Sequence, residues 1–193
     1  MYNPNARRGR LIALTLVAAA SAGGNCPAAV HRGGAAYDGS ARWAWDKAQP
    51  VAAQNAADAE LRQILATLVQ TDGRLPANEG SWSFVCWSPS QQKTIQVTIA
   101  ADGSPSTSIR AEAAPGPGIQ RPLPAAWANS TDVFQAIVNA GVSLANATGA
   151  QLAVLNVASY SGVPNQAAWA INFQGSNPPN QVVRWDGTYV GPQ

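Results

Sequence analysis

Histidine, cysteine and charged residues are scarce in this sequence. Its 193 residues include one His and two Cys, and only 11% are charged. Metal sites need clusters of His, Cys, Asp or Glu at ligand spacing, and no CxxC or HxxxH occurs. The single histidine, His31, lies in a stretch without periodicity, where it could not activate a Ser or Cys nucleophile. We therefore expect no metal, no cofactor and no catalytic residue.

The start of the chain has no acidic residue. Three arginines within the first ten residues precede an uncharged apolar run from Leu11 to Ala20, and small residues follow it. This order is typical of a signal peptide, and the run is too short to span a bilayer. We predict a signal peptide over residues 1–22, cleavage after Ala22, and a secreted, periplasmic or other cell-envelope location.

Cleavage there would remove the apparent basicity. The chain has 12 basic and 10 acidic residues, and losing three arginines leaves nine basic residues and a net charge near −1. Nucleic-acid binding needs a basic face, so no nucleic-acid partner is expected. No transmembrane segment is expected once the signal is removed.

The two cysteines allow several interpretations. In an oxidising compartment Cys26 and Cys86 are candidates for one disulfide, which we favour. Cys26 could instead carry a lipid anchor. The lipoprotein signal needs a small residue directly before the cysteine, and Asn25 at that position disfavours this interpretation. A buried free thiol at Cys86 is the remaining alternative.

Apolar periodicity divides the rest of the chain. Residues 23–40 predict a flexible lead-in. Leu61, Ile64, Leu65 and Leu68 recur at helical spacing and predict an amphipathic helix over 51–70. Strict alternation in 81–87 and 94–100 predicts a hairpin that the turn at Asp102-Gly103 closes. Proline-rich residues 104–124 predict a loop, and 111–124 a linker.

A similar order follows the linker. Ser130-Thr131-Asp132 predicts a helix start, and strands with alternating character follow up to the turn at Asp186-Gly187. Trp82 and Trp169 hold equivalent strand positions, 87 residues apart (169 − 82). We therefore predict an α+β fold of two helix-then-antiparallel-hairpin units, over 41–110 and 125–193, with an internal duplication as one interpretation.

The pattern of a helix followed by SWSFVCWSPSQQKTIQVTIAADG, echoed in the second half, resembles small secreted bacterial domains of the PepSY-like and cystatin-like type. The resemblance implies a helix packed across an antiparallel sheet. It favours a binding or inhibitory module over a catalyst.

Seven tryptophans are the remaining chemical feature. We assign Trp82 and Trp169 to the core and expect Trp43, Trp45 and Trp87 to be exposed anchors for a partner, the first two sharing one face of an extended segment. The leading hypothesis is an exported, non-catalytic module that binds a protein or peptide. The alternatives are a carboxylate-dependent hydrolase of cell-wall or sugar polymers, with two carboxylates roughly 5–10 Å apart, and a structural or assembly subunit.

Overall fold

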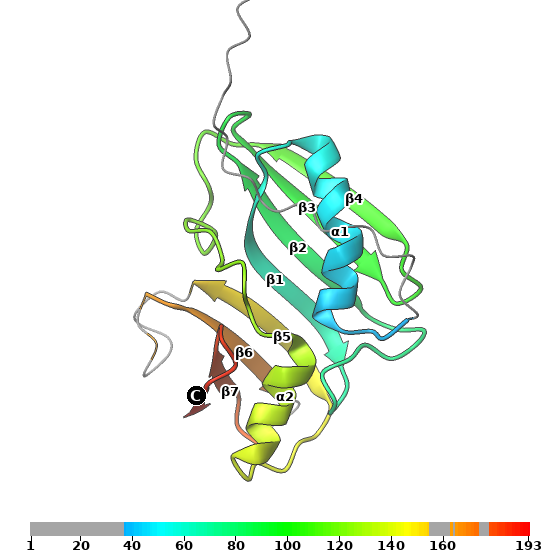
Figure 1. Ribbon diagram of the computed structural model, residues 1–193, viewed down its shortest axis with the longest axis vertical. Coiled ribbons are helices and arrows are strands. Elements are labelled where there is room, and N and C mark those ends of the chain that lie inside the picture. The colour runs from blue at the N-terminus through cyan, green and yellow to red at the C-terminus, as the bar shows by residue number, and fades with distance from the viewer. Residues whose placement is uncertain (1–36, 155–162, 164, 174–177) are drawn as a thin grey trace, which may run out of the picture. The chain divides into compact units, whose positions relative to one another are not determined.

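A computed structural model describes residues 37–154, 163, 165–173 and 178–193, which all belong to one compact unit, Ala35–Gln193. The predicted signal peptide, most of the lead-in, and Cys26 lie outside the described residues. Within them the chain forms two helices and one eight-stranded antiparallel sheet, ordered β4-β3-β2-β1-β5-β6-β7-β8 (Figure 1). The elements are α1 (Ala41–Asn55), β1 (Glu60–Val69), β2 (Ser81–Ser88), β3 (Lys93–Ala100), β4 (Pro105–Ala111), α2 (Ser130–Asn139), β5 (Ala147–Val154), β6 (Ala167–Phe173), β7 (Gln181–Arg184) and β8 (Tyr189–Pro192).

The predicted fold class is wrong. A helix followed by strands does occur twice, but each helix precedes four strands, and β1 pairs with β5, so both sets form one continuous sheet. The fold is therefore dominated by a sheet and is not a pair of separate helix–hairpin units. We call residues 41–111 the first half and residues 130–192 the second half.

The helix predicted over 51–70 is also wrong. The helix is α1, it begins earlier, and residues 60–69 form the central strand β1. A stripe of small buried side chains holds α1 against the sheet, formed by Ala41, Ala44, Ala48 and Ala52. In β1 a register shift between Leu61 and Gln63 and a positive φ at Leu68 interrupt the period of two, which is why its leucines mimic helical spacing.

The hairpin predicted from alternation is confirmed, but the turn predicted to close it is wrong: residues 89–92 connect β2 to β3, and Asp102-Gly103 joins β3 to β4. β2 and β3 pair antiparallel from Ser81↔Ala100 to Ser88↔Lys93, and Asp102 accepts from Ser104 N in the turn after β3. The loop predicted from residue 104 is wrong at its start, because residues 105–111 form the edge strand β4. Exposure of both faces and the flanking prolines hid this strand from the apolar pattern.

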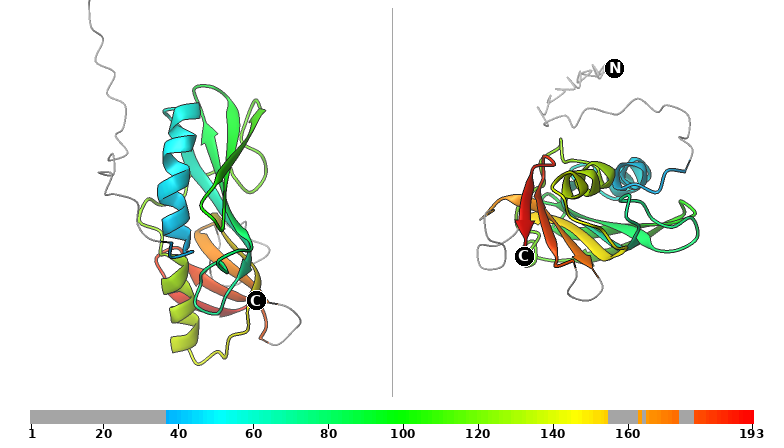
Figure 2. Two further views of the ribbon diagram at one scale, coloured as in Figure 1. Left: turned by 90° about the vertical axis from the view of Figure 1, so that its right-hand side faces the viewer. Right: turned by 90° about the horizontal axis from the view of Figure 1, so that it is seen from below.

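Both helices cover the same face of the sheet (Figure 2). A row of paired, buried residues crosses the sheet beneath them: Val97, Phe84, Ile64, Leu152, Trp169 and Val183. Trp82 and Trp169 are fully buried there with ring centroids 6.2 Å apart, which confirms their assignment to the core. Burying such rings is among the largest apolar contributions that a small domain can make.

The two tryptophans also tie the sheet to the helix starts. Trp82 Nε1 donates to Gly39 O at 3.0 Å, and Trp169 Nε1 donates to Ala128 O at 3.2 Å. Each acceptor directly precedes the N-cap of a helix, Ser40 for α1 and Asn129 for α2. The indole hydrogen bonds therefore fix both helix N-termini over the centre of the sheet.

Candidate functional site

The face of the sheet away from the helices differs between the two halves. In the second half it carries small apolar side chains, and Val163 packs on them in a minor cluster with Ala153, Ala168, Val182 and Val190. In the first half the equivalent row runs through Gln63, Val85, Gln96 and Ser108. Val85 is apolar and buried, and the other three are polar and half-buried or exposed. We call this first-half surface, over β1–β4, the open face.

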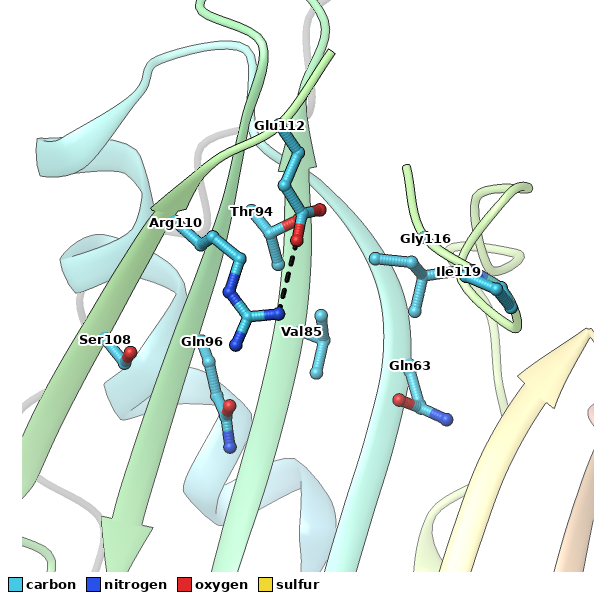
Figure 3. Close-up of a pocket in the computed structure, with 10 residues that line it drawn as sticks. Gln63, Val85, Thr94, Gln96, Ser108, Arg110, Glu112, Gly116 and Ile119 are labelled. Atoms are coloured by element: carbon cyan, nitrogen blue, oxygen red, sulfur yellow. Dashed lines mark hydrogen bonds and ion pairs between the residues drawn. The ribbon is translucent and has the colours of Figure 1, made fainter. Parts of the chain in front are cut away.

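A cleft of about 300 Å³ lies on the open face (Figure 3). Its floor comes from alternate residues of four adjacent strands, because side chains two apart on a strand point to the same side. Its lining residues are Gln63, Val85, Thr94, Gln96, Ser108, Arg110, Glu112, Gly116, Pro117 and Ile119. The polar groups come from strand residues and from Glu112, directly after β4, and residues 116–119 supply one wall.

That wall is the predicted linker, and a buried arginine holds it in place. Arg62 Nη1 donates to Gln120 O at 2.7 Å, and Arg62 also pairs with Glu60. Leu123 N donates to Leu61 O at 2.8 Å, which attaches the wall to the start of β1. The register shift in β1 frees Arg62 from the ladder for this role.

One ion pair dominates the electrostatics of the cleft. Glu112 accepts from Thr94 Oγ1 at 2.7 Å and faces Arg110 Nη1 at 3.5 Å. The Glu112 side chain is 22% exposed and that of Arg110 is 80% exposed. Thr94 therefore fixes the carboxylate, while most guanidinium donors of Arg110 are open to solvent.

Most of the side-chain amide and hydroxyl groups on the floor of the cleft make few hydrogen bonds or none within the described residues. Gln96 Nε2 donates to Ser83 Oγ at 3.3 Å. Among the described residues, the side chains of Gln63 and Ser108 have no hydrogen-bond partner. These groups both donate and accept, so the cleft matches a ligand that does the same.

The predicted tryptophan anchors do not lie at this cleft. Trp43 and Trp87 are buried, at 6% and 5% exposure, so the expectation that they are exposed is wrong. Trp43 and Trp45 lie on the helix α1 and not on an extended segment, and Trp45 is half-buried against Phe84 with ring centroids 5.2 Å apart. A helix rotates residues two apart to different sides, so these two rings do not form one surface.

Cys86 is buried under α1 and has no disulfide partner among the described residues, and burial raises the pKa of its thiol to about 12. Its predicted partner Cys26 lies outside the described residues, so the disulfide and the lipid anchor stay predictions.

The described residues contain no group of three or more His, Cys, Asp or Glu placed to hold a metal ion. Glu112 is the only carboxylate among the residues that line the cleft. A pair of carboxylates, which the hydrolase alternative requires, is therefore not what this cleft offers.

Sequence reasoning missed the residues that form the cleft. The sequence pattern predicts a helix at Gln63 and a loop at Ser108 and Arg110, whereas all three lie on strands. The signal that could have found them is the alternation of polar residues on strands whose other face is apolar, as in Gln96 between Ile95 and Val97.

In the part of the chain that the structure describes, neither helix has the length and apolar character needed to cross a membrane. No family model, curated protein or solved structure matches the chain. The resemblance to PepSY-like and cystatin-like domains therefore stays a prediction.

Proposed function

We propose that this chain is an exported, non-catalytic module that binds a protein or peptide segment in the cleft of the open face. The observation that carries the proposal is the contrast between the halves. The second half closes the equivalent surface with Val163, whereas the first half leaves a polar cleft uncovered.

The chemistry of the cleft suits a polypeptide. A peptide backbone presents donors and acceptors in alternation, which the amide of Gln63 and the hydroxyl of Ser108 can satisfy. Val85 and Ile119 add apolar contact on the floor and on the wall. Binding sites commonly combine a few oriented polar groups with apolar lining in this way.

Export is the second part of the proposal, and the sequence supports it. The basic start, the short apolar run and the small residues before residue 23 follow the order that secretion requires. A low charge content suits an extracellular surface. Secretion would bring the open face into contact with other envelope or extracellular proteins.

Selection of random 12-residue peptides displayed on phage, against the immobilised full chain, tests the proposal. The strongest selected peptide, synthesised with a fluorescent label, is then titrated by fluorescence anisotropy. We expect Ser108→Arg to weaken its binding at least about tenfold, because the new side chain fills the cleft and adds charge beside Arg110.

Ser106→Arg is the matched control. Ser106 lies on the same strand and face, is exposed, and is absent from the cleft lining. The same substitution there should change affinity less than about twofold. Failure to select any peptide, or equal effects of the two variants, would refute cleft binding.

A further inference from the structure

The two edges of the sheet are protected to very different degrees. The edge strand β8 has four residues, includes Pro192, and pairs with β7 through a register shift, between Val182↔Gly191 and Val183↔Tyr189. The edge strand β4 has seven residues, all exposed, in unbroken register from Ile99↔Pro105 to Lys93↔Ala111. Shortness, proline and irregular register are the devices that keep edge strands from pairing, and β4 lacks most of them.

The register shows which groups of β4 point outward. Ala100 N donates to Ser104 O, and Glu112 N donates to Gln92 O, at the two ends of the same β3–β4 ladder. Hydrogen-bonded pairs alternate with non-bonded pairs in an antiparallel ladder. Ser106, Ser108 and Arg110 therefore bond to β3, and Thr107, Ile109 and Ala111 turn their backbone N–H and C=O groups to the other side. We call this side the free edge, since no strand among the described residues pairs with it. Pro105 belongs to the outward set, where its missing N–H costs no ladder bond.

We propose that this free edge takes up an extended, acidic segment of the partner as an added antiparallel or parallel strand. This inference rests on the proposed function and specifies its geometry. Main-chain hydrogen bonds to Thr107, Ile109 and Ala111 supply affinity without sequence preference. Side chains of the added strand that point to the open face lie beside Ser108 and Arg110, at the mouth of the cleft.

Charge indicates the kind of segment. Arg110 is the only charged residue of β4, its side chain is 80% exposed, and its contact with Glu112 is long at 3.5 Å. Opposite charges on neighbouring strands attract across one face of a sheet. A segment with Asp or Glu on that face therefore fits better than a basic one. Ile109, half-exposed on the other face, offers an apolar contact.

A second copy of this chain fits the edge less well than a peptide segment. Pairing two β4 strands about Ser108 would join seven residues from each copy, whereas a stable protein interface uses roughly 20–30 residues a side. It would also place Arg110 opposite Ser106, without a charge partner. The area and the charge both favour a separate acidic segment.

The test uses the peptide selected on the full chain and a series of its N-methylated forms. An added strand bonds through alternate amides only, so methylation should weaken binding about tenfold or more at every second position and little in between. On the protein side, Ile109→Pro removes an outward N–H without removing a bond to β3, and should weaken binding about tenfold. Ile109→Ala keeps that N–H and should weaken binding less than about threefold.

Replacing Asp or Glu in the same peptide by Asn or Gln should weaken its binding to the native chain. The same replacement should have little effect on its affinity for the Arg110→Gln variant. Arg74→Gln is the charge-matched control, since Arg74 pairs with Asp72 at 3.1 Å away from the cleft lining. A melting temperature within a few degrees of the native chain verifies that each variant folds.

The outcomes separate the two proposals. If the peptide responds to Ser108→Arg but shows no period of two on methylation and no loss with Ile109→Pro, cleft binding stands and strand addition is overturned. Strand addition is equally overturned if sedimentation shows that the chain dimerises and Ile109→Pro abolishes the dimer, because a second copy then covers the edge. Should Ile109→Pro not fold, the methylation series decides alone.

Discussion

The contact between the two helix N-termini allows a sharp prediction. Asn129 Oδ1 accepts from Ser130 N at 2.9 Å and from Arg42 N at 3.0 Å, so a single amide oxygen caps the first turns of both α2 and α1. Ser130 Oγ accepts from Ala41 N at 3.0 Å. Two helix N-termini, each with a partial positive charge, would otherwise face each other with unsatisfied donors.

We expect Asn129→Ala to lower the free energy of unfolding by about 2 kcal/mol. Loss of an N-cap costs about 1 kcal/mol, and a second, partly buried N–H left without an acceptor costs about 1 kcal/mol more. With a urea m-value of about 2 kcal/mol per molar, the unfolding midpoint should fall by about 1 M. Urea titration followed by tryptophan fluorescence measures this shift.

Introducing a negative charge at position 129 should have the opposite effect on stability. Asn129→Asp retains an acceptor and places a negative charge at two positive helix ends, so stability should be equal to or higher than that of the native chain at pH 7 and low salt. Asn78→Ala, at an exposed position, is the control and should change stability by less than about 0.5 kcal/mol. A midpoint shift for Asn129→Ala no larger than that for Asn78→Ala would contradict a shared cap at Asn129.

Three further predictions follow from single groups. Hydrogen bonds from Ser88 and Ser90 lower the pKa of Asp58 to about 2, so Asp58 contributes stability above about pH 4 that is lost as the pH falls toward 2. Asp58→Asn should therefore reduce the fall in melting temperature between pH 4 and pH 2. An unchanged fall would exclude a stabilising role for the Asp58 carboxylate. Cys86 is buried and its pKa is raised to about 12, so its thiol should resist iodoacetamide in the folded chain and react after unfolding in urea without reductant. Failure of the unfolded chain to react would favour a Cys26–Cys86 disulfide instead. Gly73 has φ +80° and a Cβ there would lie 2.5 Å from Ser130 O, whereas Gly141, at φ +85°, has open space. Gly141→Ala should therefore lower the free energy of unfolding by about 1 kcal/mol, and Gly73→Ala should lower it by at least about 2 kcal/mol more. Urea titration measures both losses, and similar losses would contradict the close approach of Gly73 to Ser130.

The polar cleft could be anticipated only in part. Alternation in β3 places Gln96 on one face of the strand and the buried Ile95 and Val97 on the other. A polar row on one side of the hairpin therefore follows from the sequence. The same pattern cannot show that Gln63 and Ser108 extend this row, since their pairing depends on the register of β1 and β4. Nor can it show that the sheet surface away from the helices carries a cleft in the first half and is covered by Val163 in the second.

The tryptophans illustrate the same limit. Large rings in a strand with alternating character are expected in the core, and Trp82 and Trp169 lie there. The sequence favours exposure of Trp43, on one face of an extended segment, and of Trp87, on the face of its strand opposite Trp82, and both expectations are wrong. Burial of Trp43 depends on the docking of α1, and Trp87 is buried although it lies on the side of β2 away from the helices.

Local signals in the sequence are enough to predict several elements. The β2–β3 hairpin, the start of α2 near Ser130 and the turns at Asp102-Gly103 and Asp186-Gly187 depend on side-chain alternation, capping groups and glycine at positive φ, and all act over a few residues. Three other features are not predictable from local signals: residues 60–69 form a central strand, both halves share one sheet, and β4 lies at an edge of it. These features arise from pairing between segments far apart in the chain, which overrides local propensity when it buries more apolar surface.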